Sequence, residues 1–149
     1  MPLHPILGES EEITFAGAVM PSSPARILVV DDDADLRGVI AAVIRAKGYD
    51  VVEAANGAVA MDVLREDASF SLILLDLVMP VMDGWRFRVE QEWDASLASI
   101  PVVVMSTFGS RGAEMPPPAT AYLEKPFRLS QLADTIKSHA RAPTTPETR

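Results

Sequence analysis

Short apolar runs alternate with longer segments of mixed polarity along most of the chain. The runs are rich in Val, Ile and Leu and are bounded by turn-forming residues, a pattern typical of strands buried on both faces. In the segments between them, apolar residues recur every three or four positions, which predicts amphipathic helices. Strands are predicted at residues 26–31, 50–54, 70–76, 100–106 and 120–124.

Helices are predicted after the first, second, third and fifth of these strands. Asp33 can cap the first helix with its carboxylate, and Gly48 can end it. The apolar face of this helix consists of Leu36, Val39, Ile40, Val43 and Ile44. The helix after the third strand carries Trp85, Val89 and Trp93.

The segment after the fourth strand departs from this alternation. It contains two glycines, Gly109 and Gly112, and three consecutive prolines at residues 116–118. Proline has no amide hydrogen and its ring clashes with the preceding turn, so a regular helix cannot run through these residues. We therefore expect the helix at this place, the fourth of the series, to be short or absent.

Strands that alternate with helices call for right-handed crossovers and a parallel sheet covered on both faces. We therefore predict a doubly wound α/β sandwich whose five strands, numbered along the chain, take the order 2-1-3-4-5. In such a sheet, ligands bind at the carboxyl ends of the strands, near the switch point between strands 1 and 3. Side chains at those strand ends are the candidates for function.

The two ends of the chain differ in composition from the part between them. Residues 1–24 are interrupted by proline, glycine and glutamate, and residues 141–149 have no apolar period. We expect a mobile extension before, and a disordered tail after, a single domain at residues 25–140. A short strand or a docking peptide between Ile13 and Val19 is left open as an alternative.

Composition narrows the class of protein. With 149 residues, of which 48% are hydrophobic and 23% charged, the chain fits one domain with a sizeable core. The net charge of −8 argues against a nucleic-acid-binding surface, which needs a basic patch. The absence of cysteine excludes disulfides, thiol catalysis and zinc-thiolate sites. No apolar run approaches the roughly 18 residues of a membrane span, and no secretory signal is evident, so we expect a cytoplasmic protein with no membrane partner.

Polar side chains mark the ends of four predicted strands. Two acids end the first strand, one acid ends the third, a serine ends the fourth and a lysine follows the fifth: Asp31, Asp32, Asp76, Ser106 and Lys125. In the predicted topology all of them fall on one edge of the sheet. The sequence therefore predicts an acidic pocket with one cation beside it.

Four segments together resemble the receiver domains of two-component response regulators, and they occur in the same order. These segments are Leu28–Asp32, Leu74–Gly84, Pro101–Ser106 and Tyr122–Phe127. Each alone is a weak signal, whereas four of them on the expected strand ends are highly specific. The resemblance covers roughly residues 25–140 and implies a flavodoxin-like, doubly wound (βα)5 sandwich.

The resemblance implies that Asp76 is the phosphoacceptor, which attacks a phosphohistidine and becomes an acyl phosphate. It also implies a Mg²⁺ site formed by Asp76, Asp31, Asp32 and the backbone carbonyl of Val78. Crowded carboxylates favour such an ion, because they raise one another's proton affinity unless a cation intervenes, and Mg²⁺ prefers oxygen ligands. The ion would also offset charge on the transferring phosphoryl group.

Further residues match positions at which the family contacts or senses the phosphoryl group. The resemblance assigns Lys125 to one phosphate oxygen and Ser106 to another, and it places a cis peptide before Pro126 that turns the lysine inward. Tyr122 matches the aromatic residue of the family's switch, and it could equally be a core residue with its hydroxyl at the surface. Asp83 is expected to cap a helix rather than to bind a ligand.

The resemblance implies a stand-alone receiver, because no output domain follows the last predicted helix. Its partners would be a sensor histidine kinase or a histidine phosphotransfer protein, and a downstream protein target reached by contact or by phosphorelay. Apart from metal-dependent self-phosphorylation and autodephosphorylation, no enzymatic activity is expected. Two alternatives stay open: a docking module that keeps the fold without phosphorylation, and an aspartyl-nucleophile phosphohydrolase. The second is disfavoured by Val78, where such enzymes usually place another acid.

Overall fold

A five-stranded parallel sheet forms the centre of the computed structural model, which describes residues 13–15, 18–20, 24–107 and 115–143. The strands of this sheet are β3 (Arg26–Val30), β4 (Asp50–Ala54), β5 (Leu72–Asp76), β6 (Val102–Ser106) and β7 (Ala121–Glu124). They lie in the order β4-β3-β5-β6-β7, and every neighbouring pair is parallel. The predicted order 2-1-3-4-5 is confirmed.

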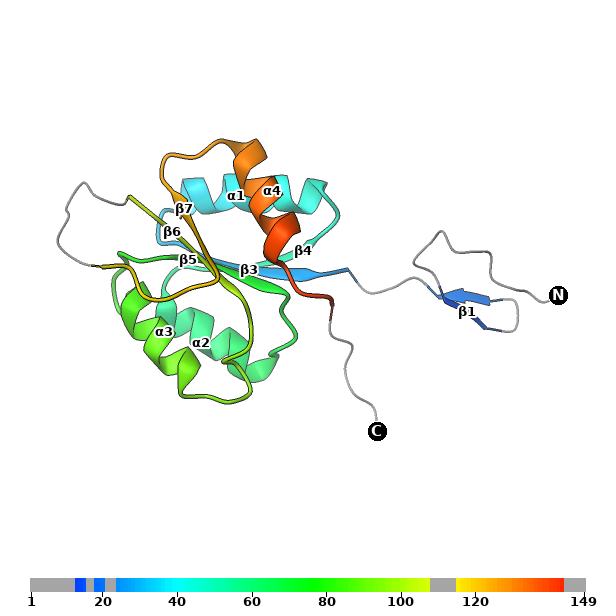
Figure 1. The fold of residues 1–149 in the computed structure, drawn as a ribbon, viewed down its shortest axis with the longest axis horizontal. Helices are drawn as coiled ribbons and strands as arrows, with labels where there is room; N and C mark the ends of the chain where they lie inside the picture. Colours follow the sequence, from blue (N-terminus) through cyan, green and yellow to red (C-terminus); the bar gives the residue numbers. More distant parts are fainter. Residues whose placement is uncertain (1–12, 16–17, 21–23, 108–114, 144–149) are drawn as a thin grey trace.

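Four helices cover the sheet within the described residues. They are α1 (Ala34–Ala46), α2 (Gly57–Glu66), α3 (Gly84–Glu92) and α4 (Leu129–His139). Figure 1 shows α1 and α4 on one face of the sheet, and α2 and α3 on the other. As predicted, Asp33 caps α1, and its side chain accepts hydrogen bonds from two backbone N–H groups of the first turn. The arrangement is the doubly wound sandwich that the sequence predicts.

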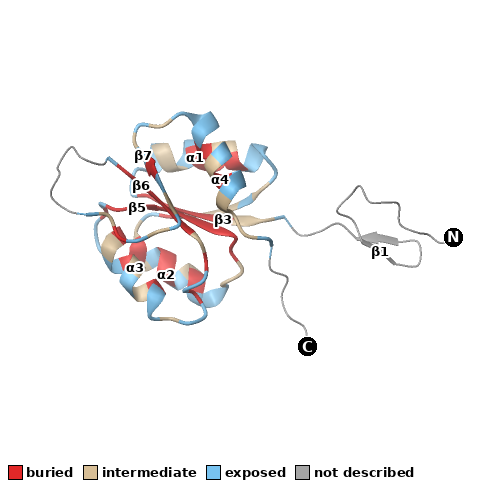
Figure 2. Cartoon of the chain, in the orientation of Figure 1, coloured by how far each residue is buried: buried red, intermediate tan, exposed pale blue. Residues whose placement is uncertain are grey.

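The core consists of two apolar layers, one on each face of the sheet. β5 and β6 are buried along their whole length, as the red strands in Figure 2 show. Phe70 and Phe87 belong to the layer shared with α2 and α3, whereas Ile40, Ile44 and Leu132 belong to the layer shared with α1 and α4. Burial on both faces explains why these strands are almost continuously apolar in sequence. Among the described residues, no helix has the length and apolarity needed to cross a lipid bilayer.

α3 is apolar on two sides, which its sequence pattern did not reveal. Phe87 and Gln91 are buried, and the Gln91 amide donates to two backbone carbonyls of the following loop, at 2.9 and 3.1 Å. Val89 and Trp93, two of the apolar residues that mark this helix in the sequence, are instead 53% and 85% exposed. The helix therefore faces the core through one set of residues and solvent through another.

Residues 115–120, here called the proline segment, lead into β7. None of the described residues between β6 and β7 is helical, and residues 108–114 lie outside the described residues. For the described part, the predicted loss of the fourth helix is therefore confirmed. Its cause is the run of prolines at 116–118, which cannot supply the amide hydrogens that a helix needs.

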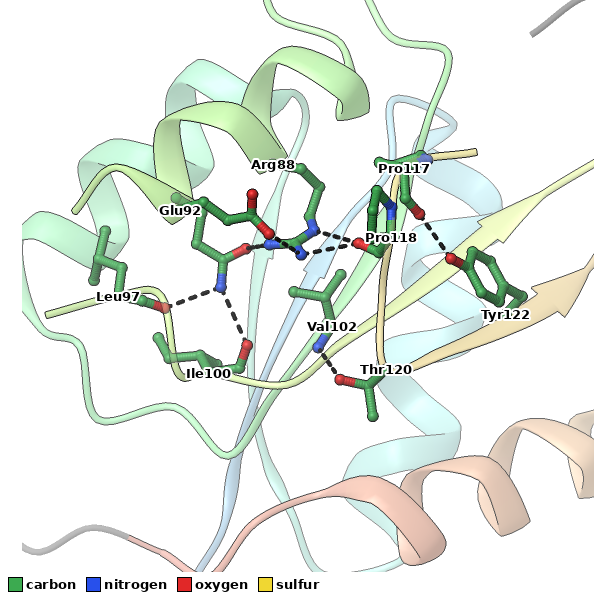
Figure 3. Close-up of polar contacts among 10 residues, drawn as sticks. Arg88, Glu92, Leu97, Ile100, Val102, Pro117, Pro118, Thr120 and Tyr122 are labelled. Atoms are coloured by element: carbon green, nitrogen blue, oxygen red, sulfur yellow. Dashed lines mark hydrogen bonds and ion pairs between the residues drawn. The ribbon is translucent and has the colours of Figure 1, made fainter. Parts of the chain in front are cut away.

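Side chains of α3 and β7 hold the backbone of the proline segment in place. Arg88 Nη2, Trp85 Nε1 and the Tyr122 hydroxyl each donate a hydrogen bond to a backbone carbonyl, at 2.9, 2.8 and 2.8 Å. The acceptors, in the same order, are the carbonyl oxygens of Pro118, Met115 and Pro117. Figure 3 shows the contacts of Arg88 and Tyr122. The segment is thus an ordered substitute for a helix at this position.

The two ends of the chain carry features beyond the central domain. β1 (Ile13–Phe15) and β2 (Ala18–Met20) form an antiparallel pair, so the short strand that the sequence left open is present. Mobility of the extension at residues 1–24 stays a prediction. At the other end, Arg141 donates hydrogen bonds to two backbone carbonyls just before β5, at 3.0 and 3.1 Å. Disorder of the tail also stays a prediction, and residues 144–149 lie outside the described residues.

Candidate functional site

The carboxyl ends of the central strands bring the predicted polar residues to one edge of the sheet. Asp31 directly follows β3, Asp76 is the last residue of β5, and Ser106 is the last residue of β6. The side chains of these three residues are buried, whereas that of Asp32 is exposed. The parallel topology thus places acids from distant parts of the sequence beside one another, as predicted.

The three aspartates form a cluster that includes one cation. Oxygen atoms of Asp31, Asp32 and Asp76 lie within 4.8 Å of one another. Lys125 Nζ lies 2.9 Å from Asp31 Oδ2 and 3.4 Å from Asp76 Oδ1. A cis peptide precedes Pro126, as predicted, and the backbone N–H of Lys125 donates to the carbonyl of Ser106 at 2.7 Å. The lysine is therefore fixed to the end of β6 and directed to both buried acids.

Burial and charge alter the protonation of the central acid. Removal of Asp76 from water, together with the nearby charge of Asp31, raises the pKa of Asp76 from 3.8 to about 6. Lys125 and the backbone N–H of Leu77 oppose this rise only in part. Desolvation lowers the pKa of Lys125, but its contacts with Asp31 and Asp76 more than offset that effect and raise it. Lys125 therefore stays cationic, but its single charge does not balance the three carboxylates of the cluster.

Arg37 holds the buried acid Asp31 from the side of α1. Its Nη1 donates to the backbone carbonyl of Asp31 at 2.7 Å, and its Nε donates to Glu53 Oε1 at 3.0 Å. The backbone N–H of Asp31 donates in turn to the carbonyl of Ala54 in β4. Sequence reasoning missed Arg37, because one partner directly follows β3 and the other lies in β4, and nothing in the spacing of the sequence connects them.

The loop after β5 packs directly against Asp76. The backbone N–H of Gly84 donates to the carbonyl of Leu77 at 2.8 Å, and a Cβ atom at Gly84 would lie 2.6 Å from the carbonyl oxygen of Asp76. Only glycine therefore allows α3 to begin this close to the acceptor strand. Asp83 caps α3 by accepting from a backbone N–H of its first turn, as predicted.

Strain occurs in the same loop at Val81. This residue has φ +70° and is exposed, although it is β-branched. A β-branched side chain in the left-handed region is a true outlier, with a cost of about 1 to 3 kcal/mol. Contacts on both sides hold the loop in this conformation. Gly84 packs on one side, and on the other the N–H of Gly57 donates to the Met82 carbonyl at 2.9 Å.

Tyr122 lies on the outer edge of the sheet rather than in the core. Its ring is about half exposed, and its hydroxyl donates to the carbonyl of Pro117. The sequence left two roles open for Tyr122, a switch residue or a core residue with its hydroxyl at the surface. The half-exposed ring does not fit a core residue. The switch role of Tyr122 stays a prediction, as does the ligand role of the Val78 carbonyl.

The donor set suits a hard divalent cation. All three acids offer carboxylate oxygens, and among the described residues only Lys125 places a side-chain cation within 4 Å of those oxygens. Mg²⁺ prefers oxygen ligands of this kind and needs only one or two carboxylates beside water and phosphate. Burial first, and then the charge of Asp31, raise the pKa of Asp76, and a cation would offset both effects. The residues present therefore fit Mg²⁺.

Comparison with known proteins agrees with this geometry. The profile of the response regulator receiver domain family matches residues 27–137. The response regulator receiver protein CpdR of Brucella abortus is 34% identical over 113 residues, which cover 75% of this chain and 93% of CpdR. The probable transcriptional regulator ycf27 of Porphyridium aerugineum is 31% identical over 116 residues, which cover 78% of this chain and 48% of that protein. The chain thus spans about half the length of some curated relatives and nearly all of others.

A solved structure shows the same fold around a metal. The receiver domain of the sensor histidine kinase PA1611 from Pseudomonas aeruginosa matches with a TM-score of 0.72 and 26% identity. The match covers 78% of this chain and 98% of that one, and that structure has a magnesium ion coordinated in its active site cleft. Sheet order, acidic cluster and family profile agree, so the flavodoxin-like fold is confirmed. The chain belongs to the response regulator receiver domain family and is a receiver of two-component signalling.

Proposed function

We propose that Asp76 accepts a phosphoryl group from a phosphohistidine, with Mg²⁺ held by Asp31, Asp32 and Asp76. The observation that carries this proposal is the cluster itself, in which three carboxylates lie within 4.8 Å of one another beside Lys125. The backbone carbonyl of Val78 would complete the protein ligands. Bound Mg²⁺ would offset the negative charge of the acids and of the transferring phosphoryl group.

The chain's own residues supply the nucleophile and its surroundings. With a pKa of about 6, Asp76 is largely ionised at neutral pH, so a carboxylate oxygen is available to attack phosphorus. The new O–P bond forms as the N–P bond of the phosphohistidine breaks, and the imidazole leaves with the electron pair. Lys125 Nζ, already beside Asp76, would donate to one phosphoryl oxygen, and the Ser106 hydroxyl would donate to another.

The proposed partners follow from this chemistry. The donor would be a sensor histidine kinase or a histidine phosphotransfer protein of the cytoplasm, and the output would be contact with a downstream protein or onward transfer of the phosphate. The proposed activities are self-phosphorylation and autodephosphorylation, both dependent on the metal. Phosphohydrolase turnover is not proposed, because no acid stands two residues after Asp76. Val78 occupies the position at which an aspartyl phosphohydrolase usually has one.

The proposal is tested with a small phosphoryl donor. The chain is incubated with acetyl phosphate and Mg²⁺, and the modified residue is located by mass spectrometry after trapping of the acyl phosphate. We expect modification at Asp76, and its loss in Asp76→Asn and in the presence of a chelator. Asp134→Asn, an exposed acid on α4, serves as the matched control and should be modified normally. Modification elsewhere, or none in the wild type, would contradict the proposal.

One observation favours a second function, that of a docking module. The proline segment replaces a helix next to the position where receivers sense the phosphoryl group. Hydrogen bonds from Tyr122 and Arg88 hold this segment, so the surface beside Tyr122 is fixed without a phosphoryl group. Such a module would signal equally well with Asn in place of Asp76. Loss of signalling in Asp76→Asn would exclude this alternative.

A further inference from the structure

The outer face of α3 carries an apolar stripe. Trp85 and Val89 of α3, and Trp93 directly after it, are each four residues apart, so they lie along one side of the helix. Trp93 is 85% exposed and Val89 is 53% exposed, whereas Trp85, at the N-terminal end of the helix, is partly buried and packs against the core. Both tryptophans of the chain belong to this stripe. A contiguous apolar face of this kind is typical of a protein interface, since tryptophan is a preferred anchor residue there.

Met115 extends the stripe at its Trp85 end. The carbonyl of Met115 accepts the hydrogen bond of the Trp85 indole, and the Met115 side chain is 81% exposed. The proline segment, held by Arg88, therefore adds a flexible sulfur-containing side chain beside the half-buried tryptophan. Sulfur makes favourable contacts with aromatic rings. One end of the stripe thus offers a surface, formed by Trp85 and Met115, against which a side chain can pack, and the other end offers the projecting ring of Trp93.

The charged residues of α3 have an order that opposes the helix itself. Arg86 and Arg88 lie in its first half, and Glu90 and Glu92 lie in its second half. Positive charge near the N-terminus and negative charge near the C-terminus oppose the helix dipole. The pairs Arg86–Glu90 and Arg88–Glu92 also run in the less favourable direction for partners four residues apart. Helix stability therefore does not explain this order.

The order suits a second copy of the same helix in antiparallel orientation. The sequence Trp-Arg-Phe-Arg-Val-Glu-Gln-Glu-Trp at residues 85–93 exchanges tryptophan with tryptophan and arginine with glutamate when reversed about Val89. In an antiparallel pair the basic half of each helix faces the acidic half of the other. A parallel pair would bring like charges together. The same reversal places the Trp93 ring of each copy against Trp85 and Met115 of the other.

We propose that α3 is a self-association surface, through which two copies of the chain pair about a two-fold axis near Val89. Arg86 and Glu90, four residues apart, lie on the same flank of the stripe. In the antiparallel pair this flank of one helix runs beside the same flank of the other, so Arg86 of one copy would lie beside Glu90 of the second, and the two tryptophans at each end would stack. Because the contact involves little more than one helix and Met115, we expect a weak dimer with a dissociation constant on the order of micromolar.

Sedimentation velocity of the full chain tests the proposal, over protein concentrations from about 1 to about 500 µM. The wild type should pass from monomer to dimer in this range. Val89→Arg should remain monomeric, because it brings two like charges to the two-fold axis. Val39→Arg is the matched control, since Val39 is an equally exposed helical valine on α1, at 49%, and this variant should dimerise normally. Trp93→Ala should weaken the dimer roughly 30-fold, as loss of an interface anchor does.

Charge exchange tests the antiparallel orientation. Arg86→Glu alone and Glu90→Arg alone should each weaken the dimer, and an equimolar mixture of the two variants should restore association. A wild type that is monomeric throughout, a dimer that Val89→Arg and Trp93→Ala leave unchanged, or single variants that the mixture does not rescue would each overturn the proposal. No phosphoryl donor is used, so such a failure would leave the assignment of Asp76 unaffected.

Discussion

Asp76→Asn should stabilise the metal-free protein, and the size of the effect should depend on pH. In the fold, burial and the charge of Asp31 raise the pKa of Asp76 from 3.8 to about 6. Between these two values the unfolded chain has already released the proton that the folded chain keeps, so stability falls as pH rises through this window. Above about pH 6 the whole penalty is present, and below the ordinary pKa it is absent.

The magnitude follows from the two pKa values. The difference between 3.8 and about 6 corresponds to about 3 kcal/mol, at about 1.4 kcal/mol for each tenfold change in proton affinity. The pocket opens to solvent on the side of Asp32, so screening reduces this value, and we expect about 1 to 3 kcal/mol. Asparagine keeps the acceptor for the backbone N–H of Leu77, and Lys125 keeps its contact with Asp31. The charge is therefore the main change.

The assay is urea denaturation in the presence of a chelator, at about pH 4 and about pH 8. The gain in free energy of unfolding should be small at the lower pH and full at the higher one. Asp134→Asn, which removes an exposed charge on α4, should show no such dependence. Added Mg²⁺ should reverse the order at about pH 8, because only the wild type keeps all three carboxylate ligands. Equal stability of Asp76→Asn and wild type at both pH values would refute the reasoning.

Three other variants test a buried hydroxyl at the opposite end of β5 and two contacts nearer the site. Ser71→Ala should raise the free energy of unfolding by about 1 kcal/mol in urea denaturation, because the buried Ser71 hydroxyl has no hydrogen-bond partner among the described residues. Arg37→Lys should weaken Mg²⁺ binding roughly tenfold in a calorimetric titration, since one ammonium cannot hold both the Asp31 carbonyl and its acidic partner; an unchanged affinity would contradict this. Tyr122→Phe should lower the free energy of unfolding by about 1 kcal/mol through loss of the bond to the Pro117 carbonyl, and an equal stability would show that this bond contributes nothing.

The strand order and the acidic edge could be predicted because they depend on local patterns and on a chirality rule. Buried parallel strands are apolar throughout, so the last apolar residue before Asp76 also marks the edge of the sheet. Right-handed crossovers restrict which strands can be neighbours, and the order 2-1-3-4-5, one of the common doubly wound orders, brings Asp31, Asp76 and Ser106 together. The loss of a helix at residues 116–118 was equally local, because it follows from the covalent structure of proline.

Features that depend on contacts between distant segments could not be predicted. In α3, apolar residues occur on both sides, so periodicity alone did not decide which side faces the core. The buried side is the one with Phe87 and Gln91, and the Gln91 amide donates to the carbonyls of Leu97 and Ile100 in a loop that has no regular pattern. Arg37 was missed for the same reason, since one acceptor directly follows β3 and the other lies in β4.

The absence of a side chain at Gly84 gives the protein a built-in optical probe. Because α3 begins in backbone contact with the Asp76 carbonyl, the next residue, Trp85, lies one peptide away from that contact, and its indole is fixed by the Met115 carbonyl. Emission from this ring should respond to changes at the acceptor without any attached dye. Replacing Trp93 with phenylalanine would leave Trp85 as the single fluorophore of its kind, so occupancy of the acceptor could be followed in real time in an ordinary spectrofluorimeter.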